Sequence, residues 1–284
     1  MEVKTALVTG ANTGIGKEIA LLFASKGIKV FIASRSYERT IPVLQTIEER
    51  HGPQQCEWIS LELDSLNSVN RCAEVFLEKN LPLNYLVNNA GFAGSKGLTK
   101  EGFELAFGTN YFGHYVLTNR LSYALIRSKN ARVINVSSKI HGSVKRLDFS
   151  SFRKKTKSFS GISEYAVSKL ANILFTIELH RRYSKLGVFS FAVHPGLVDT
   201  DIWRTLPFFL RPILRLKGML SAEEGAKNVM YCALDVSNIY SGQYFSKCQP
   251  SRPSSLASNK KLATKLWEHS DLWMKQYVKK KFKS

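Results

Sequence analysis

The chain begins with the segment Thr5-Ala6-Leu7-Val8-Thr9-Gly10-Ala11-Asn12-Thr13-Gly14-Ile15-Gly16, in which an apolar run leads into three closely spaced glycines. A helical pattern over residues 17–24 follows at once. Strand, glycine turn and helix in this order bring backbone N–H groups and a helix N-terminus against a pyrophosphate. The spacing G-x-x-x-G-x-G differs from the usual G-x-G-x-x-G, but its position between a strand and a helix predicts a dinucleotide-binding loop.

Short apolar runs alternate with helical patterns along all 284 residues, and no linker, repeat or low-complexity stretch divides them. This βαβ succession predicts a single α/β domain of Rossmann type over residues 1–284, with a doubly wound parallel sheet of about seven strands and helices on both faces. A dinucleotide would lie across the carboxyl ends of the strands, at the topological switch point. The strands are expected near residues 3–8, 29–34, 57–61, 84–87, 132–136, 188–193 and 243–245.

The strand expected over residues 29–34 bears on the choice of cofactor. An NAD site normally offers an Asp or Glu about 20 residues past the loop to hold the ribose 2′-hydroxyl. This chain has Ser34, Arg35 and Ser36 at that point. A guanidinium pairs well with a 2′-phosphate, so Arg35, with Arg39 nearby, predicts NADP(H). The alternative is an ordinary solvated loop arginine.

Proton-transfer chemistry is indicated by the run Glu164-Tyr165-Ala166-Val167-Ser168-Lys169 and by the pair Ser137-Ser138. A phenol titrates near ~10 in water, and a lysine four residues later lies on the same helix face, where its ammonium is expected to lower the tyrosine pKa. A serine hydroxyl from a strand end would bind the same reacting oxygen. The Tyr-x-x-x-Lys spacing alone is weak, because Tyr277 and Lys281 in the basic tail match it too.

These motifs together resemble the short-chain dehydrogenase/reductase family. The resemblance covers nearly the whole chain and looks most like the NADP(H)-dependent retinol dehydrogenase subgroup. It also rests on segments further along the chain: Asp64, Asn88-Asn89-Ala90-Gly91, Phe107-Gly108-Thr109-Asn110-Tyr111-Phe112-Gly113-His114, Ser168-Lys169-Leu170-Ala171-Asn172-Ile173-Leu174-Phe175, Pro195-Gly196-Leu197-Val198-Asp199-Thr200, Ser241-Gly242-Gln243-Tyr244-Phe245 and Leu266-Trp267-Glu268-x-Ser270.

The resemblance implies a role for each matching residue. Tyr165 would donate and accept the proton, and Lys169 would assist it and bind the ribose. Ser138, rather than Ser137, would bind the substrate carbonyl, and Asn110 would hold a proton-relay water. The implied cofactor ligands are Gly10, Asn12, Thr13, Gly14, Ile15, Gly16, Arg35, Asp64, Asn89, Gly91, Tyr165, Lys169, Pro195, Gly196, Val198 and Thr200.

Structural alternatives stay open for three of the polar residues. Asp64 could cap the helix that starts near Leu66, and Asn88 could satisfy backbone groups beside the sheet. Asn110 could be a buried brace of a helix.

The reaction implied is reversible hydride transfer between a nicotinamide and a carbonyl carbon, with retinal or another long apolar aldehyde as the expected substrate. A steroid or xenobiotic carbonyl reductase is the alternative among enzymes. A non-catalytic scaffold that senses NADP(H) and binds a membrane or protein partner is the alternative of a different class. Asn110, Ser138, Tyr165 and Lys169 are all present, which favours catalysis. A homodimer is compatible with the family.

The net charge of +19 is unevenly placed. Residues 258–284, expected as a basic C-terminal helix or tail, hold eight lysines against Glu268 and Asp271, and residues 203–217 mix large apolar side chains with four cations and no acid. Such a mixture suits the headgroup region of an anionic bilayer. Residues 203–220 are expected as a substrate lid, and the basic segment between Ser138 and Tyr165 as a loop near the active-site entrance. The alternatives are a lid helix packed on the core and a solvated or frayed tail. No motif supports nucleic-acid binding.

The four cysteines, Cys56, Cys72, Cys232 and Cys248, show no spacing typical of a metal site or a disulfide framework. Reduced thiols and no metal are therefore expected. The first strand begins within a few residues of Met1, which leaves no room for a signal peptide, and no apolar run approaches the ~20 residues of a membrane span. A cytoplasmic protein is expected, with peripheral membrane contact left open; many presumed relatives carry an N-terminal anchor that this sequence does not show.

Overall fold

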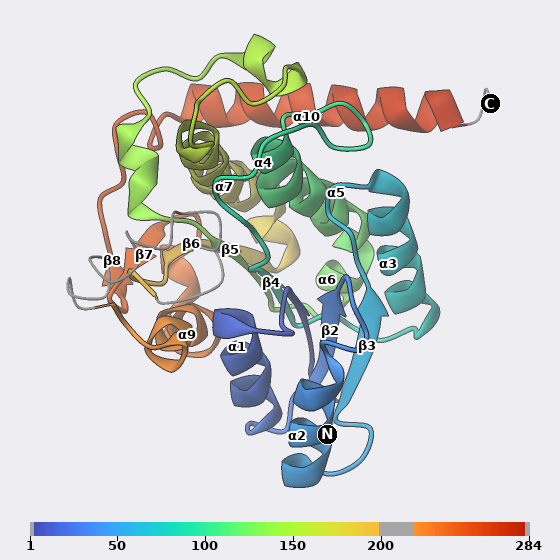
Figure 1. Ribbon diagram of the computed structural model, residues 1–284. Coiled ribbons are helices and arrows are strands. Elements are labelled where there is room, and N and C mark those ends of the chain that lie inside the picture. Colours follow the sequence, from blue (N-terminus) through green and yellow to red (C-terminus); the bar gives the residue numbers. More distant parts are fainter. Residues whose placement is uncertain (1–2, 199–218, 282–284) are drawn as a thin grey trace.

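The computed structural model describes residues 3–198 and 219–281. Residues 203–218 of the predicted lid (203–220) and the cofactor ligand Thr200 lie outside these residues. One sheet runs through the molecule with helices on both faces (Figure 1), which confirms the α/β fold. Its strands are β1 (Thr5–Thr9), β2 (Lys29–Ser34), β3 (Cys56–Ser60), β4 (Tyr85–Asn88), β5 (Ala131–Val136), β6 (Val188–His194), β7 (Tyr244–Ser246) and β8 (Gln249–Pro250).

The strand order is β3-β2-β1-β4-β5-β6-β7-β8. Strands β1 to β7 pair in parallel, and β8 pairs with β7 antiparallel. After β3 the chain crosses back to place β4 beside β1, so the winding direction reverses between these two strands. The loops that leave β1 and β4 therefore diverge, and this is where doubly wound sheets bind their ligands.

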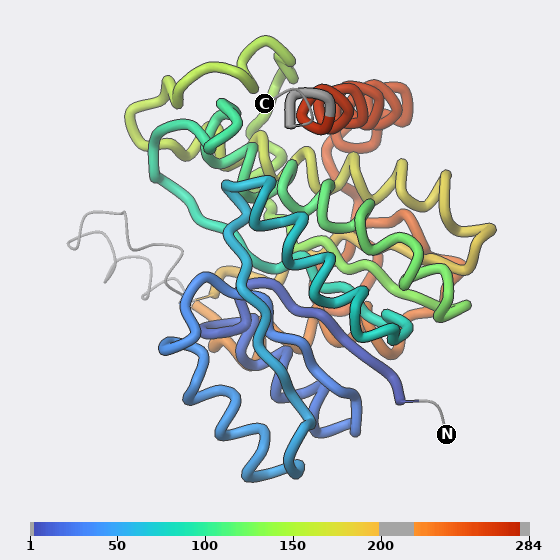
Figure 2. The backbone as a smooth tube through the Cα atoms, turned by 90° about the vertical axis from the view of Figure 1, so that its right-hand side faces the viewer, coloured from blue at the N-terminus to red at the C-terminus, as the bar shows by residue number. Residues whose placement is uncertain are grey.

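Helices cover the sheet in two layers, and α10 lies across the outer side of one layer (Figures 1 and 2). The helices α1, α2 and α9 belong to one layer, and α3, α5 and α7 to the other. The α-helices are α1 (Gly14–Ala24), α2 (Ile41–His51), α3 (Leu66–Glu78), α4 (Leu105–Phe107), α5 (Gly113–Arg120), α6 (Ser122–Arg127), α7 (Ile162–Tyr183), α9 (Ala222–Met230) and α10 (Lys260–Lys281). Shorter turns are the π-helices η1 (Gly108–Phe112) and η7 (Tyr231–Asp235) and the 3-10 helices η2 (Lys139–Ser143), η3 (Phe149–Arg153), η4 (Ser184–Leu186) and η8 (Asn238–Tyr240).

Each central strand is apolar on both sides, because both faces of the sheet are covered. In β1, Leu7 packs into the core on the side of α3, α5 and α7, whereas Ala6 and Val8 pack into the core on the side of α1 and α9. The alternation follows the two-residue period of a strand. Burial from both sides fixes the strand ends, and with them the loops that form the site.

Two parts of the fold bear on the expectation: an additional strand and the C-terminal segment. The eighth strand, β8, was not predicted; it follows Lys247 and Cys248, which both have positive φ angles and turn the chain back on β7. The C-terminal segment, expected as a basic helix or tail, is a helix in its described part, and only its outer face is exposed. Helix α10 packs on α7, with Trp267 buried, and the Ser270 hydroxyl lies 2.8 Å from the Tyr111 hydroxyl.

None of the helices in the described ranges is both long enough and apolar enough to cross a bilayer. All four cysteines are free thiols, and Cys248 alone among them is exposed.

Candidate active site

The glycine loop joins β1 to α1 and passes very close to its neighbours. A Cβ atom added at Gly16 would lie 2.5 Å from the Gly10 carbonyl oxygen and 2.6 Å from Asn89 Nδ2, so no larger residue fits there. The Gly10 N–H donates to the Ala33 carbonyl of β2 at 2.8 Å. The loop is thereby held against the ends of both β2 and β4, which is the close backbone approach that a bound pyrophosphate requires.

The N-terminus of α1 is available to an anion. Thr13 is its N-cap, but the Thr13 side chain makes no capping hydrogen bond, and the first turn contains no acidic residue. The first backbone N–H groups of a helix lack partners within the helix, and the helix dipole favours negative charge there. Ile15 and Val198 both approach Gly225 of α9, since a Cβ at Gly225 would lie 3.3 Å from Ile15 and 2.7 Å from Val198. The uncapped N-terminus of α1 suits a phosphate group, and the apolar side chains of Ile15 and Val198 lie beside it.

Arg35 stands directly after β2 with an exposed side chain, and it forms no ion pair with any part of the chain that the structure describes. The last residue of β2 is Ser34, whose hydroxyl is 2.7 Å from the Thr40 hydroxyl and accepts from Trp58 Nε1 at 3.0 Å. The strand thus ends in a hydroxyl, and no carboxylate occupies the position that would bind a ribose 2′-hydroxyl.

A buried hydrogen-bond chain links this loop to η1 through Thr9 and His114. The Thr9 hydroxyl accepts from the backbone N–H groups of Asn89 at 3.0 Å and Ala90 at 2.9 Å. His114 Nδ1 lies 3.0 Å from the carbonyl oxygen of Asn110, which can only accept, so Nδ1 carries the proton. His114 Nε2 is then the acceptor for the Thr9 hydroxyl at 2.9 Å. Burial lowers the pKa of His114 to about 4, which keeps the ring neutral as this chain of bonds requires.

Thr9 and His114 were not predicted as organisers of the site. Both stand inside quoted motifs, but only the fold reveals that they meet.

Asn110 occupies the π-helical turn η1, and both the oxygen and the nitrogen of its side-chain amide form hydrogen bonds. Its Nδ2 donates to the Phe92 carbonyl and to Ser168 Oγ, each at 3.0 Å, and its Oδ1 accepts from the Phe92 N–H at 3.1 Å. A Cβ at Gly91 would lie 3.0 Å from Asn110 Oδ1 and 3.5 Å from Lys169 Nζ. Asn110 therefore lies beside Gly91 and Lys169 in the site. It also braces the backbone of Phe92.

The two serines after β5 have different surroundings. Ser137 is buried and donates to the Lys169 carbonyl at 2.8 Å, which ties α7 to the end of β5. Ser138 is half-buried and forms a side-chain hydrogen bond with Tyr165. The Ser138 hydroxyl therefore faces the phenol, whereas that of Ser137 faces the α7 backbone.

His141 holds the loop that carries Ser138. Its Nδ1 lies 2.7 Å from the Ser138 carbonyl oxygen, and its Nε2 accepts from the Ser254 N–H at 3.1 Å. The loop is thus connected to the segment before α10. This contact was not predicted, because the two segments lie more than a hundred residues apart in the sequence.

The pKa of Tyr165 is raised above its ordinary value, which differs from the expected lowering. Burial of the phenol is the main cause, and the hydrogen bond with Ser138 acts in the opposite direction. Lys169 is one turn away as predicted, but its ammonium donates to the Val136 carbonyl at 2.9 Å and lies 5.5 Å from the Tyr165 ring centroid. Burial also lowers the pKa of Lys169 to about 8.

The remaining predicted ligands lie around the same strand ends. Asp64 follows β3 and is half-buried, and it does not cap α3, because Ser65 is the N-cap and accepts from the Ser68 N–H. The Pro195 carbonyl after β6 accepts from Asn228 Nδ2 at 3.2 Å. Gly196 has φ +106° and lies against the Leu220 side chain. Val198 forms a bridge with Leu220.

Asn88 has a structural role in the core of the sheet. Its Nδ2 donates to Asn135 Oδ1 at 2.8 Å and to the Thr118 hydroxyl at 3.1 Å. It joins β4 to β5 and α5 through side chains, and not through the backbone groups that the alternative interpretation named.

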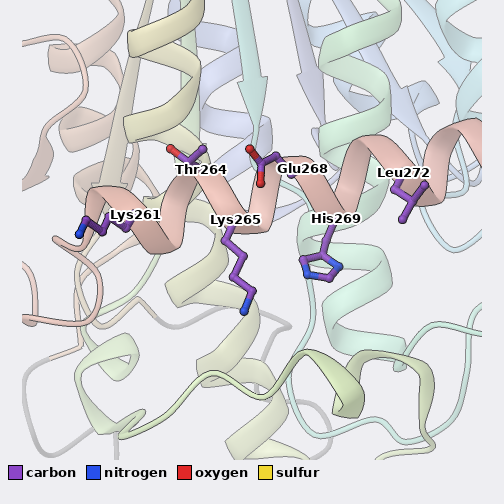
Figure 3. Close-up of a pocket in the computed structure, with 6 residues that line it drawn as sticks. All are labelled: Lys261, Thr264, Lys265, Glu268, His269 and Leu272. Atoms are coloured by element: carbon purple, nitrogen blue, oxygen red, sulfur yellow. The ribbon is translucent and has the colours of Figure 1, made fainter.

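A hollow lies on the outer face of α10, away from these strand ends (Figure 3). Its lining residues all come from that helix: Lys261, Thr264, Lys265, Glu268, His269 and Leu272. It contains none of the predicted site residues. Among residues 3–198 and 219–281, no three His, Cys, Asp or Glu side chains come together in a way that could hold a metal ion.

Comparison with known proteins gives consistent results. The family model described as short chain dehydrogenase matches residues 4–207. The chain is 39% identical over 290 residues to the WW domain-containing oxidoreductase of Gallus gallus, covering 97% of this chain and 69% of that protein. It is 36% identical over 279 residues to retinol dehydrogenase 11 of Homo sapiens, covering 94% of this chain and 84% of that protein.

A crystal structure of an uncharacterised protein from Mycobacterium paratuberculosis superimposes with a TM-score of 0.77 at 29% identity, covering 96% of this chain and 94% of that one.

Proposed function

Because this chain belongs to the short-chain dehydrogenase family, and is an oxidoreductase of carbonyl and alcohol groups that uses a nicotinamide cofactor, we propose that it uses NADP(H) and acts on a lipophilic aldehyde, with retinal as the first candidate. The observation that carries the proposal is the joining of Ser138 and Tyr165 hydroxyls beside Lys169, at the strand ends that also hold the glycine loop. The retinal assignment draws on the likeness to retinol dehydrogenases 11 and 12.

The residues of the chain would bind the cofactor in a defined order along the crevice. The N-terminus of α1 and the loop from Gly10 to Gly16 would bind the pyrophosphate, and Asn89 and Gly91 would border the nicotinamide half. Arg35 would pair with the adenosine 2′-phosphate, because a planar guanidinium matches phosphate geometry. This placement of Arg35 favours NADP(H) over NAD(H).

When bound, the nicotinamide supplies or accepts the hydride. Ser138 and Tyr165 would donate hydrogen bonds to the carbonyl oxygen as negative charge develops on it, and Tyr165 would transfer its proton to that oxygen. The raised pKa of Tyr165 keeps its hydroxyl protonated at neutral pH, as a proton donor requires. The Lys169 ammonium, with its pKa near 8, is mostly charged at pH 7 and would stabilise the phenolate that remains.

Hydrogen bonds from neighbouring residues fix the positions of these catalytic groups. Ser137 ties α7 to the end of β5, and the chain from Thr9 through His114 fixes Asn110. A site whose donors are set before substrate binds loses little free energy to reorganisation in the transition state.

The proposal is tested by NADPH oxidation with all-trans-retinal, a medium-chain aldehyde and a steroid ketone, with NADH at equal concentration as the control. Turnover of retinal with NADPH, and much less with NADH, is the expected result. Turnover of the steroid ketone alone would keep the chemistry and replace the substrate. NADPH binding without turnover of any carbonyl compound would favour the non-catalytic scaffold instead.

A further inference from the structure

Phe159 is the most exposed of the large apolar side chains that the structure describes, with 95% of its surface accessible. It lies between η3 and α7, six residues before Tyr165. We propose that Phe159, Lys96, Lys155 and Lys157, which we call the entrance tip, dock this protein on the surface of an anionic lipid bilayer. The proposal rests on the proposed function, since a lipophilic aldehyde dissolves in a bilayer.

The entrance tip is held in place on both sides. The Thr156 hydroxyl donates to Glu104 Oε1 at 2.5 Å and accepts from the Gly97 N–H at 3.2 Å. The backbone N–H groups of Lys157 and Ser158 both donate to Glu164 Oε1 at 2.9 Å. Since Glu104 binds the Thr156 hydroxyl and Glu164 binds two backbone N–H groups, the exposure of Phe159 results from the fold of the loop and not from a loose end.

The charge around Phe159 is strongly positive. Lys96 Nζ lies 4.9 Å from the Phe159 ring centroid, and Lys155 and Lys157 are exposed. None of these three lysines forms an ion pair within residues 3–198 and 219–281. The Glu164 carboxylate does not pair with these lysines, because it accepts hydrogen bonds from the loop backbone. Segment 139–161 holds seven cations and one acid: Lys139, Lys145, Arg146, Arg153, Lys154, Lys155, Lys157 and Asp148.

An apolar ring among unpaired lysines fits a bilayer surface, where the ring enters the headgroup boundary and the ammonium groups meet anionic lipid. The partly exposed Leu98 adds an aliphatic side chain to the same loop pair. Proteins that bind single-stranded nucleic acid present several rings for successive bases. Here Phe159 is the one aromatic residue among residues 154–161, which favours lipid.

The entrance tip adjoins the catalytic groups along both of its segments. Lys96 follows Gly91, the neighbour of Asn110 and Lys169, and Phe159 leads into the first turn of α7, where the Tyr165 N–H donates to the Gly161 carbonyl at 3.1 Å. The two segments touch, because a Cβ at Gly161 would lie 3.0 Å from the Gly94 backbone. A substrate leaving a bilayer at the entrance tip would therefore arrive beside the reacting groups.

The hollow on α10 borders the same basic segment (Figure 3). Lys265 Nζ lies 5.2 Å from the ring centroid of Phe149 in η3, and the His269 ring lies 4.5 Å from it. Lys261 and Lys265 thus extend the positive surface away from the entrance tip. In Figure 2 the lime-green segment around residues 145–160 lies next to the red helix α10.

The test is co-sedimentation of the full chain with vesicles of phosphatidylcholine, alone or with phosphatidylserine. Binding is expected only with phosphatidylserine and should weaken as salt rises. Phe159→Ala should lower the vesicle affinity roughly fivefold, because the apolar area that enters the headgroup boundary is lost. Lys157→Glu should lower it roughly twentyfold, because each basic residue near an anionic surface contributes about a fivefold factor and the charge reversal adds repulsion.

The matched controls are Ile239→Ala, which removes another apolar side chain that is 79% exposed, and Lys26→Glu, which reverses an exposed lysine at the far end of α1. Equal losses in the controls and the tip variants, or equal binding to both vesicle types, would overturn the proposal. Loss of oligonucleotide binding in the tip variants, with vesicle binding unchanged, would assign the surface to nucleic acid and overturn it too.

Docking and catalysis are read out separately. Turnover of a small water-soluble aldehyde without vesicles should be the same for the tip variants and the unmodified chain. Vesicle binding without any turnover would leave docking intact and refute the proposed function. Turnover without vesicle binding would refute docking alone.

Discussion

Replacement of Thr9 by Val should destabilise the protein more than the same replacement at Thr5. Both threonines are in β1 and fully buried, and valine suits a strand equally well at each position. The Thr5 hydroxyl donates to the Pro82 carbonyl alone. The Thr9 hydroxyl serves two backbone N–H donors and one imidazole acceptor. The two variants therefore differ in the number of buried polar groups that lose a partner.

The size of the difference follows from that number. A buried polar group left without a partner costs about 1–3 kcal/mol. Thr5→Val leaves one such group and should cost about 1–2 kcal/mol. Thr9→Val leaves two, the Ala90 N–H and His114 Nε2, because the Asn89 N–H keeps the Val87 carbonyl at 3.0 Å; it should cost about 2–4 kcal/mol, after allowance for non-additivity. Thr9→Val should also weaken cofactor binding, because the Asn89 and Ala90 N–H groups lose the contact that fixes their loop.

Urea unfolding of both variants measures the free energy of unfolding, and cofactor titration measures the second effect. Equal destabilisation in the two variants would refute the reasoning, because it would mean that the chain from Thr9 through His114 contributes no more than a single hydrogen bond. Unchanged cofactor affinity in Thr9→Val would show that the loop after β4 does not depend on Thr9.

Arg35→Glu should raise the Michaelis constant for NADPH by roughly tenfold or more and leave that for NADH nearly unchanged, because a charge-assisted phosphate contact is lost and repulsion replaces it; steady-state kinetics with both cofactors would show equal effects if Arg35 did not face the 2′-phosphate. Ser138→Ala should lower kcat/KM by roughly 10²–10³-fold with little change in stability, whereas Ser137→Ala should cost about 1 kcal/mol in urea unfolding and spare most of the activity; the reverse pattern would exchange their roles. Burial lowers the pKa values of His114 and His194 to about 4 from 6.5. The unfolded chain therefore takes up these protons first as pH falls, and stability should drop between about pH 6.5 and 4 by on the order of 3 kcal/mol for each histidine. His114→Gln should flatten this loss in urea titrations at several pH values, and an unchanged pH dependence would contradict the assignment.

The sequence predicted the architecture well, because the periodicity of burial is local information. Ala6, Leu7 and Val8 face alternate cores, and the run that contains them could be recognised as a strand without any knowledge of its neighbours. Strand β8 escaped prediction because Gln249–Pro250 has neither length nor β-branched residues, and its pairing depends on the turn at Lys247 and Cys248.

The helical spacing inside the candidate site was also predictable, but its electrostatics were not. Helical spacing placed Lys169 one turn from Tyr165, as the structure has it. The direction of the Tyr165 pKa shift depends on how deeply the phenol is buried and on where the ammonium points, and neither property is a function of spacing. The contacts of Thr9, His114 and His141 join segments far apart in the sequence, so only the fold shows them.

The most direct measurement of the central claim compares the unmodified chain with Tyr165→Phe for NADPH oxidation in the presence of all-trans-retinal, with NADPH binding followed by fluorescence in the same samples. The account predicts turnover by the unmodified chain, a loss of roughly 10²–10⁴-fold in the variant, and NADPH affinities within about threefold of each other. Undiminished turnover by Tyr165→Phe would contradict the assignment of Tyr165 as the proton donor.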